Sequence, residues 1–147
     1  MISAVDTNVL IDLLNRSASP TDGDAAEAVL LGARLSGPIL ISDVVYAEVC
    51  GWFTLQDEFD RFLDESGISV VPSSAAALFA AGMAWRRFSR TRLPARCAAC
   101  DAPVQLRPRV LADFLIGAHA AVHADRLLTR DRGFFRSYFE GLALLAP

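Results

Sequence analysis

Four acidic residues of this 147-residue chain stand in apolar surroundings, where carboxylates are uncommon. Asp6 and Asp131 each follow a short apolar run with the length of a buried strand. Glu48 and Asp113 each interrupt the apolar stripe of an expected helix. Any one of them could face water or pair with an arginine, and Asp6 could be only a helix cap. Their shared setting makes them candidates for one site, whose convergence in space the sequence leaves open.

Converging carboxylates favour a bound cation. A buried carboxylate is unfavourable unless it is protonated, paired or metal-bound, and neighbouring carboxylates raise one another's pKa. A divalent cation removes both costs. Because no His or Cys stands beside these acids, Mg²⁺ or Mn²⁺ fits them better than zinc. Such a cation activates a bound water and stabilises charge on a phosphate, which suits hydrolysis of a phosphodiester bond.

A basic segment fits a polyanionic substrate. One acid, Asp101, and seven arginines lie between Trp85 and Val110. The arginines are Arg86, Arg87, Arg90, Arg92, Arg96, Arg107 and Arg109. A local positive excess in a chain of net charge −3 predicts a phosphate track, and arginine also stacks on unpaired bases. The alternative is a solvated helix end whose arginines complement the helix dipole.

Two cysteines and two histidines form a weaker pattern. Cys97 and Cys100 are spaced as C-x2-C, and His119 and His123 follow at i, i+4. The gap between the pairs is longer than in zinc fingers. Three interpretations stay open: a structural zinc clip, a reduced pair without a ligand, or a zinc shared between protomers.

Composition excludes several classes of protein. The hydrophobic content of 53% and the mean hydropathy of +0.34 exclude a disordered chain. There is no lysine, which excludes a P-loop, a Schiff-base enzyme and a protein kinase. No apolar stretch reaches the roughly 20 residues of a membrane span, and no basic region precedes the first apolar run. With three cysteines, too few for a disulfide scaffold, we expect a cytoplasmic protein.

Strands and helices are expected to alternate along the chain. Strands are predicted at residues 1–5, 39–41, 68–71, 126–128 and 142–145. Helices are predicted after Thr7 and at 24–35, 43–52, 55–65, 75–90 and 109–123, with a helical turn at 133–139 and a proline-containing loop at 91–108. Thr7 or Asn8 is expected to cap the first helix. Most connections are too long for hairpins, so a three-layer α/β/α sandwich with a mainly parallel sheet follows, as one domain over residues 1–147.

Four segments together resemble PIN-domain ribonucleases, and most closely the VapC-type toxins of bacterial toxin–antitoxin pairs. They are VDTNVLIDLL at 5–14, SDVVYAEV at 42–49, ADFLIGAHA at 112–120 and LLTRDRGFF at 127–135. They occur in the family's order, and the resemblance extends over essentially the whole chain, although the arginine-rich loop is longer than in compact members. The resemblance implies a PIN-like fold, an RNA substrate, a VapB-type antitoxin and a homodimer.

The same resemblance assigns roles by position. Asp6, Glu48, Asp113 and Asp131 match the acids that hold Mg²⁺, for which Mn²⁺ can substitute, and Asp6 and Asp131 are expected to be the main ligands. Asn8 and Thr129 match polar positioning residues. The implied products carry 5′-phosphate and 3′-hydroxyl ends.

Two other functions compete with this interpretation. An aspartyl-phosphate phosphohydrolase also has an aspartate after its first strand. That class requires a second aspartate two residues on, where this chain has Asn8, and a downstream basic residue for which no lysine is available. A non-catalytic RNA-binding or antitoxin-sequestered protein is the second alternative, against which the presence of all four acids argues.

Overall fold

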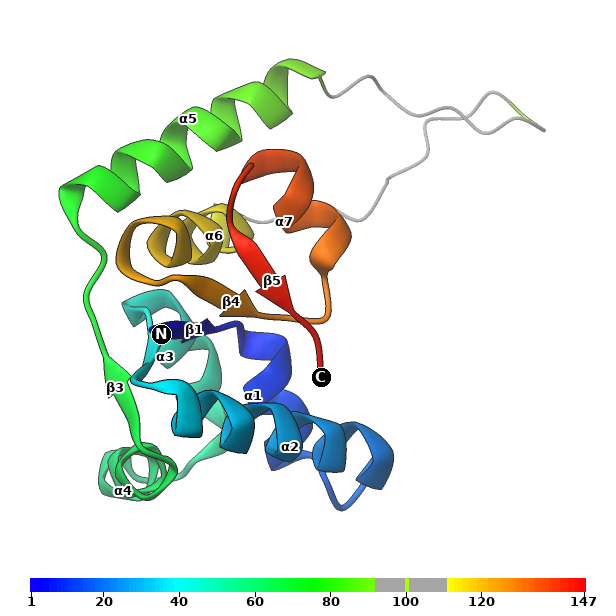
Figure 1. Ribbon diagram of the computed structural model, residues 1–147, viewed down its shortest axis with the longest axis vertical. Coiled ribbons are helices and arrows are strands. Elements are labelled where there is room, and N and C mark those ends of the chain that lie inside the picture. Colours follow the sequence, from blue (N-terminus) through cyan, green and yellow to red (C-terminus); the bar gives the residue numbers. More distant parts are fainter. Residues whose placement is uncertain (92–99, 101–110) are drawn as a thin grey trace.

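A five-stranded parallel sheet forms the centre of the molecule. The computed structural model describes residues 1–91, 100 and 111–147 (Figure 1). The strands are β1 (Ser3–Val5), β2 (Ile39–Ile41), β3 (Ile68–Val70), β4 (Arg126–Leu128) and β5 (Ala143–Leu145). Their order in the sheet is β3-β2-β1-β4-β5, and every pair is parallel. The predicted parallel sheet is therefore confirmed.

Helices cover the sheet on both sides. They are α1 (Thr7–Leu14), α2 (Pro20–Ser36), α3 (Asp43–Val49), α4 (Gln56–Ser66), α5 (Ala75–Thr91), α6 (Leu111–His123) and α7 (Arg132–Tyr138), with a 3₁₀ turn, η1, at Cys50–Trp52. In Figure 1, α5, α6 and α7 lie on one side of β1 and β4, and α1, α2 and α4 lie on the other. This arrangement is the predicted three-layer α/β/α fold.

Local sequence signals set most helix boundaries. The Ser42 hydroxyl accepts a hydrogen bond from the Val45 N–H at 3.2 Å and caps α3. Gly67 ends α4 in the left-handed conformation, at φ 67°, which glycine adopts without strain. The fully buried aromatic rings of Phe59, Phe114 and Phe135 come from three different helices and anchor these helices to the core.

Several boundaries differ from the prediction. The second helix begins at Pro20, not at residue 24, because proline is favoured in the first turn of a helix. The helix expected at 43–52 ends at Val49 and continues as the turn η1. The N-cap of α1 is Asp6 and not Thr7 or Asn8. Most of the loop predicted at 91–108 lies outside the described residues, and Thr91 is the last residue of α5.

None of the helices in the described part of the chain is long and apolar enough to cross a membrane.

Candidate functional site

The carboxyl ends of β1 and β4 place Asp6 beside Thr129. Val5 pairs with Leu128, and the Asp6 N–H donates to the Leu128 carbonyl at 3.0 Å. Asp6 directly follows β1 and Thr129 directly follows β4, so the two residues lie side by side at this edge of the sheet. The chain passes from β1 to β2 on one side and returns to β4 on the other, so this edge is the switch point of the sheet. Ligands of open parallel sheets bind at such a point.

Asp6 occupies the N-cap position of α1, but its buried carboxylate does not cap the helix. It is 6% exposed, and its side chain makes no capping hydrogen bond to α1. Burial raises the pKa of Asp6 to about 6, and the negative charges of Asp113 and Glu48 act in the same direction. A hydrogen bond from Thr129 opposes the rise. The structure thus removes the cap-only interpretation and brings three acids of the predicted set into electrostatic contact.

A small polar network orients the Asp6 carboxylate. Its Oδ2 atom accepts hydrogen bonds from the Thr129 hydroxyl at 2.6 Å and from the Asn8 amide at 2.5 Å. The Thr129 hydroxyl also accepts from the Asp131 N–H at 3.0 Å, and the Asn8 carbonyl oxygen accepts from the Arg130 N–H at 3.2 Å. Asn8 and Thr129 therefore stand where positioning residues were expected, and they link Asp6 to the turn that carries Asp131.

The remaining acids are less buried than expected. Glu48 is exposed on α3, and its carboxylate accepts a hydrogen bond from the Thr7 hydroxyl. Asp113, in the first turn of α6, and Asp131 are partly buried. The Asp131 carboxylate caps α7 by accepting from the Phe134 N–H at 3.2 Å. The apolar neighbours of these three acids in the sequence thus line the core, while the acids face its edge.

The donor chemistry of this cluster fits a hard divalent cation. Burial and mutual repulsion are the two causes that raise the pKa of Asp6, and a divalent cation relieves both. Within the described residues, no group of three or more His, Cys, Asp or Glu side chains is arranged to hold a metal ion. Glu48 and Asp131 are instead bonded to protein donors. A cation at this site would compete with those two contacts.

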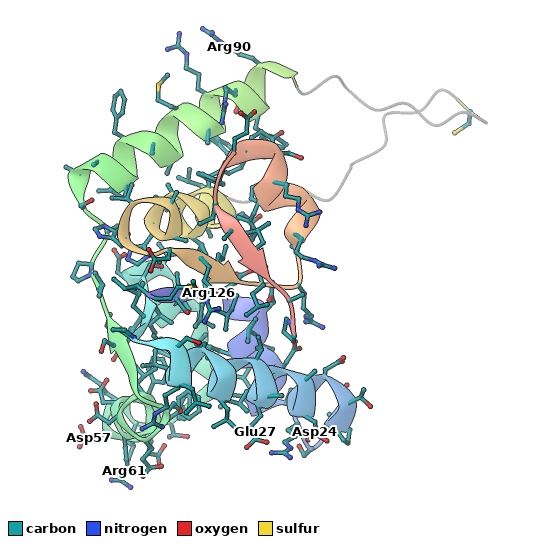
Figure 2. The ribbon with its side chains drawn as sticks, viewed as in Figure 1. Asp24, Glu27, Asp57, Arg61, Arg90 and Arg126 are labelled. Carbon is teal, nitrogen blue, oxygen red and sulfur yellow. The ribbon has the colours of Figure 1, made fainter. Side chains whose placement is uncertain are left out.

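Three of the predicted RNA-binding arginines lie on the C-terminal half of α5. Arg86, Arg87 and Arg90 are exposed, and Arg87 donates to the Tyr138 carbonyl at 2.7 Å. Figure 2 shows Arg90 at the end of α5.

Aromatic packing relates this end of α5 to the acidic cluster. The Phe88 ring of α5 lies 5.5 Å from that of Phe114, the residue after Asp113. The basic half of α5 therefore packs beside the α6 turn that bears Asp113. Arg92 and Arg96, the other two predicted residues, lie outside the described residues.

The two histidines contact the backbone of the β3–α5 connection. His119 is buried, with its Nε2 atom 2.8 Å from the Val71 carbonyl, and His123 Nε2 accepts from the Ser74 N–H at 3.3 Å. Burial lowers the pKa of His119. The histidines thus join α6 to this connection. Cys100 is exposed with a free thiol, and Cys97 lies outside the described residues.

The sequence interpretation overlooked Asp12. This acid is 7% exposed in α1 and pairs with Arg130, whose Nε atom lies 2.9 Å from Asp12 Oδ2. The signal was present, because Asp12 interrupts the apolar run VLIDLL one helical turn after Asn8.

Comparisons with known proteins give a consistent picture. The sequence matches the PIN domain family over residues 4–140. The fold is similar to a chain of VapBC2 from Rickettsia felis, solved with a promoter DNA fragment (TM-score 0.67, 22% identity, covering 99% of this chain and 98% of that one). It is also similar to a chain of VapBC-1 from nontypeable Haemophilus influenzae (TM-score 0.61, 17% identity, 99% and 98%). FitAcB from Neisseria gonorrhoeae gives a TM-score of 0.59 at 19% identity (99% and 96%). A search of curated proteins found no match.

Proposed function

The chain belongs to the PIN domain family, and from this premise we propose that it is a metal-dependent endoribonuclease acting as the toxin of a toxin–antitoxin pair. The observation that supports this most is the buried Asp6 at the switch point of the sheet, under the charges of Asp113 and Glu48. A carboxylate cluster in that position suits the binding of a cation and a phosphate.

We assign the cation to the four acids. Asp6, Glu48, Asp113 and Asp131 would hold Mg²⁺, with Mn²⁺ as a substitute. When bound, the cation neutralises charge on the scissile phosphate and activates water for attack. The assignment is supported by the chemistry of the donors, because carboxylate oxygens are the ligands that Mg²⁺ prefers.

The protein's own residues set the orientation of this cluster. Thr129 and Asn8 hold Asp6 Oδ2 from two directions, which fixes the carboxylate plane before any ligand arrives. Such supporting hydrogen bonds reduce the reorganisation that binding requires.

Substrate and partner follow from the same proposal. RNA would run across Arg86, Arg87 and Arg90 of α5, and Arg92 and Arg96, which follow α5 in the sequence, would also bind phosphates. The similar structures are named VapBC and FitAcB, and by analogy we propose a VapB-type antitoxin as the partner of this chain. We also propose a homodimer, which the resemblance to VapC-type toxins implies. Such a toxin would act in the cytoplasm.

The proposal is tested by the products of cleavage. The purified protein is incubated with a single-stranded RNA in Mg²⁺, in Mn²⁺ and in EDTA, and the new ends are determined. We expect metal-dependent cleavage to 5′-phosphate and 3′-hydroxyl ends, also where the cut nucleotide is 2′-deoxy. Cyclic phosphate ends would exclude attack by water, and RNA binding without cleavage would favour the non-catalytic alternative.

The toxin role has its own test. Expression of the wild-type chain in bacteria is expected to arrest growth, whereas expression of Asp6→Asn at the same level is not. Light scattering of the purified protein gives the mass that decides between monomer and dimer. Unimpaired growth with wild-type protein at a measurable cellular level would contradict the toxin assignment and leave the nuclease assignment standing.

A further inference from the structure

An ion pair joins the buried Asp12 of α1 to the half-exposed Arg130 and takes no part in the proposed metal site. The Asp12 side chain is 9% exposed and that of Arg130 is 49% exposed. Their contact joins Asp12 Oδ2 to Arg130 Nε at 2.9 Å, and Oδ2 has no aligned hydrogen-bond donor within the described part of the chain. The pair contributes little to stability, because the desolvation of the buried Asp12 carboxylate offsets much of its attraction to the half-exposed Arg130. Its position therefore needs another explanation.

Arg130 is attached to α1 at two points. Its backbone N–H donates to the Asn8 side chain, and its guanidinium contacts Asp12. Asn8 and Asp12 are four residues apart and share one face of α1. Arg130 also lies between Thr129 and Asp131 in the turn after β4. The Arg130 backbone thus lies at the switch point, and its guanidinium lies against α1 at Asp12.

The far edge of this guanidinium is available to a ligand. The contact between Arg130 and Asp12 is at Nε, and the terminal nitrogens, Nη1 and Nη2, donate no hydrogen bond to any residue that the structure describes. The Arg130 side chain is 49% exposed, so solvent reaches part of it. Two parallel N–H groups of one guanidinium match two oxygens of a phosphate.

The negative charge of the acidic cluster points to a role for Arg130. The cluster of Asp6, Glu48 and Asp113 repels a phosphate chain, so a nearby cation is needed to bring the substrate backbone to the site. Arg130 is bonded directly to this network through Asn8.

We propose that Arg130 binds a phosphate of the RNA substrate through its terminal nitrogens, while Asp12 is the positioning residue that holds the guanidinium by Nε. The proposal rests on the proposed ribonuclease function.

Binding, measured without cleavage, tests the role of Arg130. The Asp6→Asn protein serves as parent in EDTA, and its affinity for a fluorescent single-stranded RNA is measured by anisotropy at several salt concentrations. In this background, Arg130→Gln should weaken binding about tenfold and reduce the slope of log K against log salt by about 0.7, the contribution of one phosphate contact to single strands. The matched control is Arg61→Gln, an exposed arginine on α4 (Figure 2), which should change affinity less than about twofold.

Two further variants separate charge from geometry. Arg130→Lys keeps the charge but loses the paired donors, so the salt slope should stay while affinity falls several-fold. Asp12→Asn leaves Arg130 in place without its anchor and should likewise weaken binding with an unchanged slope. Thermal midpoints are compared throughout. If Arg130→Gln fails to fold, Arg130→Lys decides, and parental affinity in that variant overturns the proposal.

The outcomes distinguish the two proposals. Parental affinity and salt slope in folded Arg130→Gln overturn the role of Arg130 and leave the ribonuclease standing. If the Asp6→Asn parent binds no RNA and the wild type cleaves none, both are overturned.

Discussion

At the scale of single residues, the Thr129 hydroxyl connects the two halves of the site. It donates to Asp6 Oδ2 and accepts from the Asp131 N–H, so one oxygen atom sets the relation between two acids that are far apart in the sequence. Thr129→Val removes both hydrogen bonds at nearly constant volume. We expect kcat/KM for RNA cleavage to fall about 10- to 100-fold, the usual effect of losing a residue that supports a metal ligand.

The matched variant for this prediction is Thr129→Ser, which keeps the hydroxyl. It should retain cleavage within about threefold of wild type, given the conserved donor and acceptor. Wild-type activity in Thr129→Val would contradict the role of the hydroxyl, and a loss in Thr129→Ser as large as that in Thr129→Val would show that the methyl group is needed as well.

Asp6 should destabilise the metal-free protein at neutral pH. Its pKa is raised from 3.8 to about 6, so between these values the folded state binds more protons than the unfolded state, and stability falls as pH rises through this window. In EDTA, Asp6→Asn should therefore raise the free energy of unfolding by about 3 kcal/mol at pH 7 and by only about 0.5 kcal/mol at pH 4.

Urea unfolding at the two pH values measures this effect. Asp57→Asn, on the exposed surface of α4 (Figure 2), serves as the control and should stay within about 0.5 kcal/mol of wild type at both. If Asp6→Asn is less stable than wild type at pH 7, protein groups already stabilise the ionised Asp6 carboxylate in the absence of metal.

At the scale of elements, the sequence predicted the strands well and some helix ends poorly. The segments 39–41 and 126–128 match β2 and β4 because short apolar runs between turn residues allow little else. The turn η1 could not be predicted, since Cys50–Trp52 continues the apolar pattern of α3 and only packing tightens the backbone. The start of α2 at Pro20 was readable, but the polar residues around it favoured a turn.

The contact between α6 and α7 depends on a glycine. A Cβ on Gly117 would lie 2.3 Å from Phe139 Cε2 and 2.9 Å from Phe135 Cδ1, so any side chain there pushes two buried rings. We expect Gly117→Ala to lower the free energy of unfolding by about 1–3 kcal/mol, the usual cost of overpacking.

Gly82→Ala is the control for this substitution. Gly82 is exposed in α5 with open space at its Cβ position, so alanine should stabilise the helix by about 0.5–1 kcal/mol. Thermal or urea denaturation of both variants gives the comparison. A stable Gly117→Ala would show that α7 can shift away from α6 at little cost.

At the scale of the whole molecule, the site forms only when the sheet does. Asp6 and Thr129 are brought together because β1 pairs with β4, a register that no local sequence pattern specifies. The candidate acids could therefore be identified from the sequence. Their proximity in space and the exposure of Glu48 could not be predicted. No sequence pattern predicted the ion pair between Arg130 and Asp12 of α1.

Metal binding should stabilise this assembled site. A cation held by carboxylates of the folded state alone raises the unfolding midpoint by mass action, and it displaces the proton from Asp6. We expect Mn²⁺ to raise the thermal midpoint of the wild type at pH 7, less so at pH 5, and not to raise that of Asp6→Asn. The same rise in both proteins would place the cation elsewhere.

RNA cleavage by the Asp6→Asn protein tests the central claim most directly. Wild type, Asp6→Asn and the control Asp57→Asn are compared on one RNA with Mn²⁺ and with EDTA. Wild type and Asp57→Asn should cleave at equal rates with Mn²⁺ and not in EDTA, and Asp6→Asn should be slower by about 100-fold or more. Wild-type rates for Asp6→Asn, or cleavage that survives EDTA, would contradict a metal-dependent ribonuclease built around Asp6.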